Sequence, residues 1–507
     1  MSVRPDVMTE SVVDRPAPKR PYLKGRWMDL GERVRPLQGL LRWRSFQFLA
    51  ILPNLFLFYF FILAALWGTP VGNRNIMIVF VWILWWFILI TLWVPLAGRL
   101  WCTMCPIPAL GEWLQRLRLV TVRFASKAKG FKNVLFGLNR KWPRALDNIW
   151  LQNLLFLTLA TFSALLVTRP IVSAFVLGGM IVLALGLALV FRHRVFCRYL
   201  CPVSGFLGLY AMTSSVALRS RDWDVCVRCP TKGCMLGSEN GWGCPWMVYM
   251  GKLDRSNYCG LCFECLKSCP NDNIGLFVRP FGVTETRILH LDEAYKAFIM
   301  LVLAAVYSVT LLGPWGTFKD WANVTETGDW RGFLAYAALV WGACLVAFPA
   351  MYGLLVKVSQ WASRWRGRRV LVPASASANG AGEPDFRTLF LRFSYPLVPL
   401  GLLAWIAFSL PLFFVNGSYI VSVLSDPLGW GWDLLGTAHV PWKPLIPEWV
   451  PVLQAGVLLG GLAVALRTGW AIAWELWRDP RRARWGLAPM AGLWLMVTVG
   501  FLWLFTG

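Results

Sequence analysis

Nine apolar stretches, each about 20 residues long, limit what this chain can fold into. They cover residues 46–68, 77–97, 149–168, 171–191, 295–313, 332–356, 390–415, 449–466 and 487–505. About 20 apolar residues in a helix cross the hydrocarbon core of a bilayer. Within lipid, only helices and closed barrels satisfy their own backbone polar groups. The sequence therefore predicts an α-helical polytopic membrane protein with about nine transmembrane helices.

The basic residues indicate which loops face inwards. The net charge of +24 could suggest nucleic-acid binding, but 57% of the residues are hydrophobic and the basic side chains lie in loops. On the outside we expect only Arg74, Arg169, Lys319, Arg331 and Lys443. The positive-inside rule explains this asymmetry without a nucleic-acid partner. We therefore expect a multi-pass protein of the bacterial inner (cytoplasmic) membrane, with a cytoplasmic N-terminus and a periplasmic C-terminus.

A cysteine-rich stretch lies in the inside loop after the fourth span. Its second run contains Cys259, Cys262, Cys265 and Cys269 followed by Pro270, which is the C-x2-C-x2-C-x3-C-P pattern of bacterial ferredoxins. Its first run has the same plan with two insertions, and contains Cys226, Cys229, Cys234 and Cys244 followed by Pro245. In two-cluster ferredoxins the fourth cysteine of each run ligates the other cluster.

This spacing predicts two [4Fe-4S] clusters with crossed ligation. One would be held by Cys226, Cys229, Cys234 and Cys269, and the other by Cys259, Cys262, Cys265 and Cys244. Two zinc sites or a set of disulfides are the alternatives. Zinc ribbons use paired C-x2-C motifs rather than three cysteines at three-residue steps. Disulfides are rare in the cytoplasm, where we expect this segment.

Two further cysteine pairs form an internal repeat. Cys102 and Cys105 precede Pro106 after the second span, and Cys197 and Cys201 precede Pro202 after the fourth. Each pair follows an Arg, an apolar residue and an aromatic residue, so each closes a two-span hairpin, and the hairpins are expected to be parallel repeats. The four thiols could bind a metal, form redox disulfides, or only pack at helix ends. Cys344, within a span, is interpreted as a packing residue.

The chain is thus divided into four parts. Residues 1–45 form a basic cytoplasmic tail, disordered to about residue 24, followed by a segment at the membrane interface or a plain basic flank. Residues 46–205 form the two hairpins, and residues 206–290 the cytoplasmic ferredoxin-like segment. Residues 291–507 form a five-helix membrane domain without an assigned role, in which 372–385 is a flexible linker.

The sequence contains no evident haem ligands within the spans. Its three histidines, His193, His290 and His439, lie at or beyond span ends, and there is no C-x-x-C-H motif. Electrons that cross the membrane must therefore be carried by quinol or by a partner subunit. We expect quinone to react near the Cys-Pro loops, where Arg99, Arg194 and Arg198 would form a positive rim. The alternative is that these arginines anchor the helix ends to lipid phosphates.

Residues 46–290 resemble the NapH/NosR-type polytopic membrane ferredoxins. The shared pattern is four spans, a C-x3-C-P motif after the second and the fourth, and a cytoplasmic two-cluster segment. The stretch from Cys197 to Pro202 matches in full, whereas that from Cys102 to Pro106 is one residue shorter. The nitrous-oxide member also has a periplasmic flavin domain before its first span, which we do not expect here. The resemblance implies membrane electron transfer from quinol towards a periplasmic reductase, or a role in its maturation.

Three functions are compatible with these patterns. The first is an electron-transfer subunit that works between the quinone pool and a respiratory partner, such as a cytochrome or a reductase. The second is a metallocentre assembly or copper-reducing maturation factor. The third, a channel or transporter with a cluster sensor, is disfavoured because the spans carry few charges.

Overall fold

The computed structural model describes residues 27–121, 135–282, 285–312, 316–367 and 383–506. Within these residues eight helical stretches are long and apolar enough to cross a membrane, which confirms the polytopic helical fold. They are Phe46–Trp67, Ile78–Ala97, Pro170–Val190, Leu291–Leu312, Trp330–Trp365, Phe386–Asn416, Pro447–Trp477 and Pro480–Phe505. The predicted tail at 1–24 and most of the predicted linker at 372–385 lie outside the described residues.

Two helical hairpins form the N-terminal half of the membrane part. The first consists of α4 (Phe46–Trp67) and a second span that is built from η3 (Ile78–Trp85), α5 (Trp86–Ile88), η4 (Leu89–Trp93) and α6 (Val94–Ala97). The second consists of α9 (Trp150–Thr161), α10 (Ser163–Thr168) and α11 (Pro170–Val190). The expected span at 149–168 is not among these eight, because it is divided at Phe162, where ψ of 16° interrupts the helix. The hairpins lie side by side, because α11 packs against α4.

Short helices follow each hairpin and carry the Cys-Pro loops. After the first hairpin come α7 (Trp101–Met104) and α8 (Ala109–Arg116). After the second come η7 (Phe196–Leu200) and α12 (Pro202–Tyr210), which begins at the proline of the motif. Proline suits the first position of a helix, because its missing N–H would have no partner there. In each loop, the second cysteine of the motif thus follows the end of one short helix, and the proline begins the segment that leads into the next.

The ferredoxin segment is built on a small antiparallel sheet in the order β1-β3-β2. Strand β2 (Val216–Ser220) pairs along its whole length with β3 (Ile274–Val278), with Val216 opposite Val278 and Ser220 opposite Ile274. Between these strands lie α13 (Trp223–Val227), α14 (Gly233–Leu236), η8 (Ser256–Tyr258) and α15 (Glu264–Ser268). Because β2 and β3 pair, the two ends of the cysteine-rich stretch lie close together.

The basic segment before the first span also joins this sheet. Strand β1 (Met28–Asp29) pairs with β3, and α2 (Leu30–Arg33) and α3 (Arg35–Arg42) follow it. Leu41 of α3 is buried in the same apolar cluster as Phe263 and Leu266. Residues 27–42, for which the sequence suggested a membrane interface or a plain flank, therefore pack on the ferredoxin segment.

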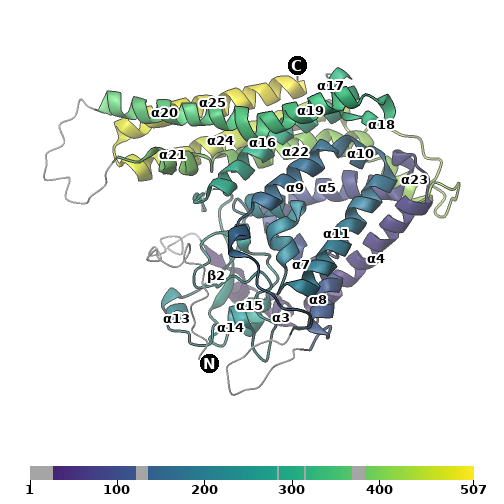
Figure 1. The fold of residues 1–507 in the computed structure, drawn as a ribbon, viewed down its shortest axis with the longest axis horizontal. Coiled ribbons are helices and arrows are strands. Elements are labelled where there is room, and N and C mark those ends of the chain that lie inside the picture. The colour runs from purple at the N-terminus through teal and green to yellow at the C-terminus, as the bar shows by residue number, and fades with distance from the viewer. Residues whose placement is uncertain (1–26, 122–134, 283–284, 313–315, 368–382, 507) are drawn as a thin grey trace.

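Five membrane helices make up the C-terminal half (Figure 1). They are α16 (Leu291–Leu312), the continuous pair α19 (Trp330–Gly342) and α20 (Phe348–Gly367) joined by η9 (Ala343–Ala347), α21 with α22 (Phe386–Phe393, Leu397–Asn416), α24 (Val450–Trp477) and α25 (Pro480–Thr506). Short helices α17 (Gly316–Ala322), α18 (Val324–Thr327) and α23 (Tyr419–Ser425) connect them. Besides η8, the described residues include the 3₁₀ turns η2 (Gly72–Arg74), η6 (Arg144–Leu146) and η11 (Pro447–Trp449).

The two halves share one core around Trp405. This fully buried side chain of α22 contacts the rings of Trp86, Phe206 and Tyr307, with centroid distances of 6.1, 5.5 and 5.1 Å. Its indole N–H donates to the carbonyl of Met300 on α16 at 2.8 Å. Aromatic packing of this kind buries large apolar surface and satisfies the one polar atom. The C-terminal helices therefore form one wall of the space between the hairpins.

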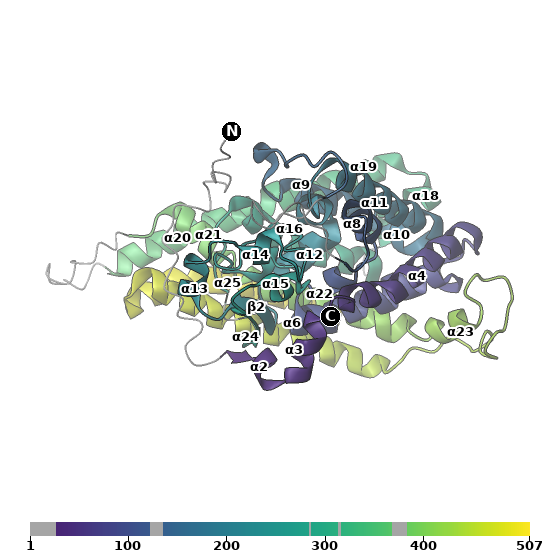
Figure 2. The same ribbon diagram turned by 90° about the horizontal axis from the view of Figure 1, so that it is seen from below.

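Loop contacts agree with the predicted alternation of the chain across the membrane. At one end of the helices, Thr69 N–H donates to the carbonyl of Leu428 at 2.7 Å, which joins two loops predicted outside. At the other end, Glu475 forms ion pairs with Arg287 at 3.0 Å and with Arg392 at 2.6 Å. In Figure 1 the ferredoxin helices α13 and α14 lie at the lower edge of the molecule and α23 lies at the upper right, and Figure 2 views the molecule from the ferredoxin side.

Candidate metal centres

Cys226, Cys229, Cys234 and Cys269 come together, and we call them the outer thiol group. Burial raises the pKa of the neighbouring Tyr249 phenol, and all four thiols raise it further. Asn273 links the two ends of the group. Its side-chain amide donates to Cys226 Sγ at 3.3 Å, and its backbone N–H donates to Cys269 Sγ at 3.4 Å. The last cysteine of the second run therefore lies beside the first run.

Cys244, Cys259, Cys262 and Cys265 form a second set, the inner thiol group. Burial raises the pKa of Cys265, and the nearby thiols Cys262, Cys259 and Cys244 add to the rise. Burial likewise raises the pKa of Cys244 to about 11, with a contribution from Cys259. The sulfur of Cys244 accepts a hydrogen bond from the backbone N–H of Val248 at 3.4 Å. The last cysteine of the first run thus lies beside the second run, in the crossed arrangement that the spacing suggested.

Neither thiol group matches a site for a single metal ion. In the part of the chain that the structure describes, no three His, Cys, Asp or Glu side chains are placed to hold one ion. Zinc–sulfur bonds of about 2.3 Å would require four thiolates within roughly 4 Å of one another. A polynuclear cluster separates its ligands further. Four cysteines in each group, in ferredoxin-type sequence spacing, therefore fit an iron–sulfur cluster better than zinc.

The four cysteines of the Cys-Pro loops also share one location, and we call them the loop thiol group. Burial raises the pKa of Cys201 to about 12, and Cys102 from the other loop contributes. Burial raises the pKa of Cys105 as well, with contributions from Cys102 and Cys201. Cys102, Cys197 and Cys201 are buried, and Cys105 is partly exposed. The two parallel repeats thus bring their thiols to one place.

The unequal length of the two loops is absorbed by the type of helical turn. Cys102 and Cys105 lie at α7, an α-helical turn of four residues. Cys197 and Cys201 lie at η7, a π-helical turn of five residues. A π turn accommodates one additional residue within a helix. The two cysteine pairs therefore end at equivalent Cys-Pro positions, although the first loop is one residue shorter.

The arginine of each repeat crosses to the other loop. Arg99 donates to Ser204 Oγ, just after the second Cys-Pro pair, and also to the carbonyl of Asn257. Arg194 donates to the carbonyl of Cys102 at 2.8 Å and forms an ion pair with Glu112. Burial alone would raise the pKa of Glu112, but Arg116 and Arg194 hold it below its ordinary value. Arg99 and Arg194 are buried, and their guanidinium groups connect the two loops.

The ferredoxin segment rests directly on the Cys-Pro loops. The hydroxyl of Thr103, between Cys102 and Cys105, lies 3.0 Å from the carbonyl of Gly260 and 2.8 Å from that of Leu261. On the second loop, Arg194 N–H donates to the carbonyl of Pro245 at 3.0 Å, and Arg198 donates to that of Trp246 at 2.6 Å. The inner thiol group therefore lies next to the loop thiol group. Nothing in the sequence marks Thr103 for this role.

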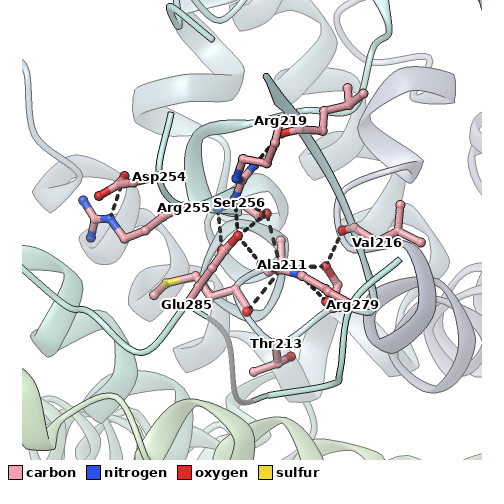
Figure 3. A network of polar contacts seen from close by, with 12 residues as sticks. Ala211, Thr213, Val216, Arg219, Asp254, Arg255, Ser256, Arg279 and Glu285 are labelled. Atoms are coloured by element: carbon pink, nitrogen blue, oxygen red, sulfur yellow. Dashed lines mark hydrogen bonds and ion pairs between the residues drawn. The ribbon is translucent and has the colours of Figure 1, made fainter. Parts of the chain in front are cut away.

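A buried ion network fixes the same segment to the membrane helices (Figure 3). Glu285 forms ion pairs with both Arg219 of β2 and Arg279, and accepts from the backbone N–H of Ser256 at 2.6 Å. Arg279 also donates to the carbonyl of Ser214 at 2.8 Å and to that of Ala211, after α12, at 3.0 Å. Buried charges need such partners, because an unpaired charge is costly away from water.

An apolar cavity of about 280 Å³ lies between the hairpins and helices α16 and α22. All four members of the loop thiol group line it, together with Trp82, Trp85 and Trp86 of the second span. It also reaches Leu57 of α4, whose side chain is 46% exposed on the outer surface of the helices. Neither Arg99 nor Arg194 lines this cavity. The positive rim that the sequence suggested at a quinone site therefore lies on the far side of the Cys-Pro loops from the cavity.

A family model described as a 4Fe-4S binding domain matches the chain twice, at residues 78–128 and 173–225. Each match covers one long span and the Cys-Pro loop that follows it, and the two together include Cys102, Cys105, Cys197 and Cys201. No curated protein and no solved structure matches the chain.

Proposed function

We propose that this membrane protein exchanges electrons between the quinone pool and a respiratory redox partner. Its two matches to a 4Fe-4S binding domain and its apolar helices fit iron–sulfur electron transfer in a membrane. One observation carries the proposal. The loop thiol group lies beneath the inner thiol group and also lines the apolar cavity. An electron could then move from the cavity to the loops and through the inner to the outer thiol group, or in the reverse direction. The partner would be a cytochrome or reductase subunit of a larger complex.

Three iron–sulfur centres would supply the one-electron steps. Two [4Fe-4S] clusters would be held by the outer and inner thiol groups, and a third centre by the loop thiol group. The chain supports anionic clusters with backbone N–H donors to sulfur, from Asn273, Val248 and Ser204. Such hydrogen bonds and the burial of the sulfurs are the features by which a protein sets a cluster's potential. The arginines behind the loops would add positive charge near the inner cluster.

The cavity suits a quinone in shape and polarity. Ligand pockets usually have volumes from about 300 Å³ upwards and are mostly apolar with a few polar groups. This cavity approaches that size, and its few polar residues include Ser204 beside the loop thiols. The exposed side chain of Leu57 marks where it approaches lipid, so an isoprenoid tail could leave the cavity there. A quinone ring would then lie next to the loop centre.

Metallocentre assembly remains the second candidate, because soft thiol pairs also suit copper transfer. Transfer of a metal to a partner protein requires accessible thiols. Cys102, Cys197 and Cys201 are buried beneath the ferredoxin segment. The geometry therefore favours electron transfer over metal delivery.

The test is anaerobic mixing of the oxidised protein with a short-chain quinol while the cluster absorbance is followed. Reduced protein must also be mixed with quinone, since equilibrium can favour either direction. Val176→Trp places a larger side chain of α11 in the apolar cavity. It should slow both reactions by more than about tenfold, because a quinone displaced from the loop thiol group no longer has the geometry that electron transfer needs. Val182→Trp makes the same change on the exposed face of α11 and should have no effect. If neither direction transfers electrons, even with a co-purified partner, metal assembly becomes the leading function.

A further inference from the structure

A second, polar cavity of about 20 Å³ lies behind the second Cys-Pro loop. Its lining includes Arg99, Gln152, Ser204, Asn257 and Lys296. A cavity of this volume has room for about one water molecule. Ser204 also lines the large apolar cavity, so its side chain borders both spaces.

Three polar atoms of lining residues have no hydrogen-bond partner among the described residues. They are Asn257 Oδ1, Arg99 Nε and Arg198 Nε, and the first two belong to residues that are 9% and 3% exposed. Buried polar groups are almost always hydrogen-bonded, to protein or to an ordered water. One acceptor and two donors without partners around a water-sized space indicate that this cavity holds a bound water.

Lys296 brings an amine into the same cavity from the first turns of α16, where it is 2% exposed. Its Nζ donates to the side-chain oxygen of Gln152 at 2.5 Å, and the amide of Gln152 points to the carbonyl of Cys197 at 3.4 Å. The ammonium form of a lysine has three N–H donors, and the side chain of Gln152 that accepts from Lys296 carries no charge to balance it. A lysine in such a setting is well suited to give up and take back a proton.

The nearby charges do not form a dedicated partner for Lys296. Arg99, Asp292, Glu293 and Cys201 act on it electrostatically, and Arg198 and Tyr258 also line the cavity. Glu293 already accepts from Arg255 at 2.6 Å, Asn257 at 2.7 Å and Tyr258 at 2.9 Å. Asp292 accepts from the backbone N–H groups of Ile149 and Glu293. Both carboxylates are thus occupied by other donors.

We propose that Lys296 and the water of the polar cavity carry the protons released by quinol in the apolar cavity. This inference rests on the proposed function. Oxidation of one quinol yields quinone, two electrons and two protons, and the electrons pass to the iron–sulfur centres. Each proton passes by Ser204 to the water and then to the uncharged Lys296 amine. It leaves past Arg198, which lines the cavity and lies 3.6 Å from Asp147, whose side chain is 25% exposed. Quinone reduction uses the same route in reverse.

The route separates the two products of the reaction. Electrons leave through the loop thiol group on one side of Ser204, and protons leave through the polar cavity on the other. The hydroxyl of Ser204 donates to the carbonyl of Cys197 at 2.5 Å and accepts from Arg99, so it is fixed at this boundary. Asn54, Ser163 and Tyr307 also line the apolar cavity, but none of them lines the polar cavity as Ser204 does.

Lys296→Met in the full-length protein tests the inference. It should slow quinol-driven cluster reduction by about 100-fold, the order expected for loss of a proton-transfer group. Reduction by dithionite and the iron content should not change, because neither needs this proton route. In the wild type the rate should rise with pH, because the uncharged amine is the acceptor, and this rise should be absent from the variant. Ser308→Ala, a buried change on α16 away from the polar cavity, should behave as wild type.

Lys296→Ala gives an independent test if the Met variant loses iron. It leaves space for a small primary amine, so added methylamine should restore the rate in proportion to the free amine concentration. Wild-type rate and pH dependence in Lys296→Met, or absence of rescue in Lys296→Ala, would overturn the inference while the proposed function stands. A wild-type protein that never exchanges electrons with quinone would overturn both.

Discussion

The guanidinium of Arg194 reaches across the two repeats and donates to the carbonyl of Cys102 at 2.8 Å. Arg99, at the equivalent position of the first repeat, donates to Ser204 of the second. Each Cys-Pro loop is therefore held by the arginine that precedes the other. This reciprocal contact ties the geometry of the loop thiol group to the packing of the hairpins.

Arg194→Met should destabilise this junction. It leaves Glu112 with Arg116 alone and removes the donor to Cys102, and breaking a buried ion pair costs about 3–5 kcal/mol. We expect a lower melting temperature and loss of the loop centre, while the iron of residues 226–269 is retained. Arg192→Met is the matched control. Its exposed side chain donates only to the carbonyl of Asn139, so the change should alter stability by less than about 0.5 kcal/mol.

The outer and inner thiol groups should hold about eight iron atoms in two cubanes. Cys269→Ser should damage the cluster of Cys226, Cys229 and Cys234, because Cys269 lies in the outer thiol group. Cys244→Ser should damage the other cluster. Electron paramagnetic resonance of the reduced protein distinguishes the two losses. Cys344→Ser, in η9 within the membrane, should leave both signals intact. Loss of the second-run cluster alone in Cys269→Ser would exclude crossed ligation.

The four loop cysteines should act as one site. Cys102→Ser and Cys197→Ser should give similar defects in cluster content and in quinol-driven reduction. The double variant should be little worse than either, because residues of one network are not additive. Iron analysis and stopped-flow absorbance measure both properties. Additive or clearly unequal defects would mean that the two loops have separate roles.

The ferredoxin segment and the Cys-Pro loops should face the cytoplasm, as the distribution of basic residues indicates. A membrane-impermeant thiol reagent added to intact cells should not label Cys229, although this side chain is partly exposed in the outer thiol group. The same reagent should label it in inverted vesicles after the cluster is removed. A periplasmic reporter fused after Gly507 should be active. Labelling in intact cells would reverse the orientation.

Eight of the nine expected spans are long apolar helices among the described residues, and the sequence could predict them because an apolar run of fixed length has few other outcomes. The break at Phe162 could not, since neither Pro nor Gly marks it and local packing decides the backbone there. The crossed grouping of Cys244 and Cys269 follows the expectation from motif spacing, although ligation itself stays a prediction. The equivalence of the Cys-Pro loops was hidden by their unequal lengths, because a π turn has no simple sequence signature.

Contacts between distant segments were beyond the sequence. Thr103, Gln152 and Ser204 are ordinary polar residues, and their roles depend on which carbonyl or amide the fold brings near. Lys296 did carry a signal, because a charged residue within an apolar span usually has a function. The sequence also placed Arg99 and Arg194 near the loops, but only the structure shows that their guanidinium groups donate to carbonyls and a hydroxyl of the protein and do not line the apolar cavity.

The membrane loops hold the ferredoxin segment through its main chain. The carbonyls of Gly260, Leu261, Pro245 and Trp246 make the contacts with Thr103, Arg194 and Arg198. At these contacts the loops recognise the path of the backbone and not particular side chains. Elsewhere the segment is fixed by its side chains, because Arg255, Asn257 and Tyr258 donate to Glu293 of α16. During evolution the exposed surface of the segment can therefore change, and with it the soluble partners it meets, while these buried side chains keep it in place on the membrane domain.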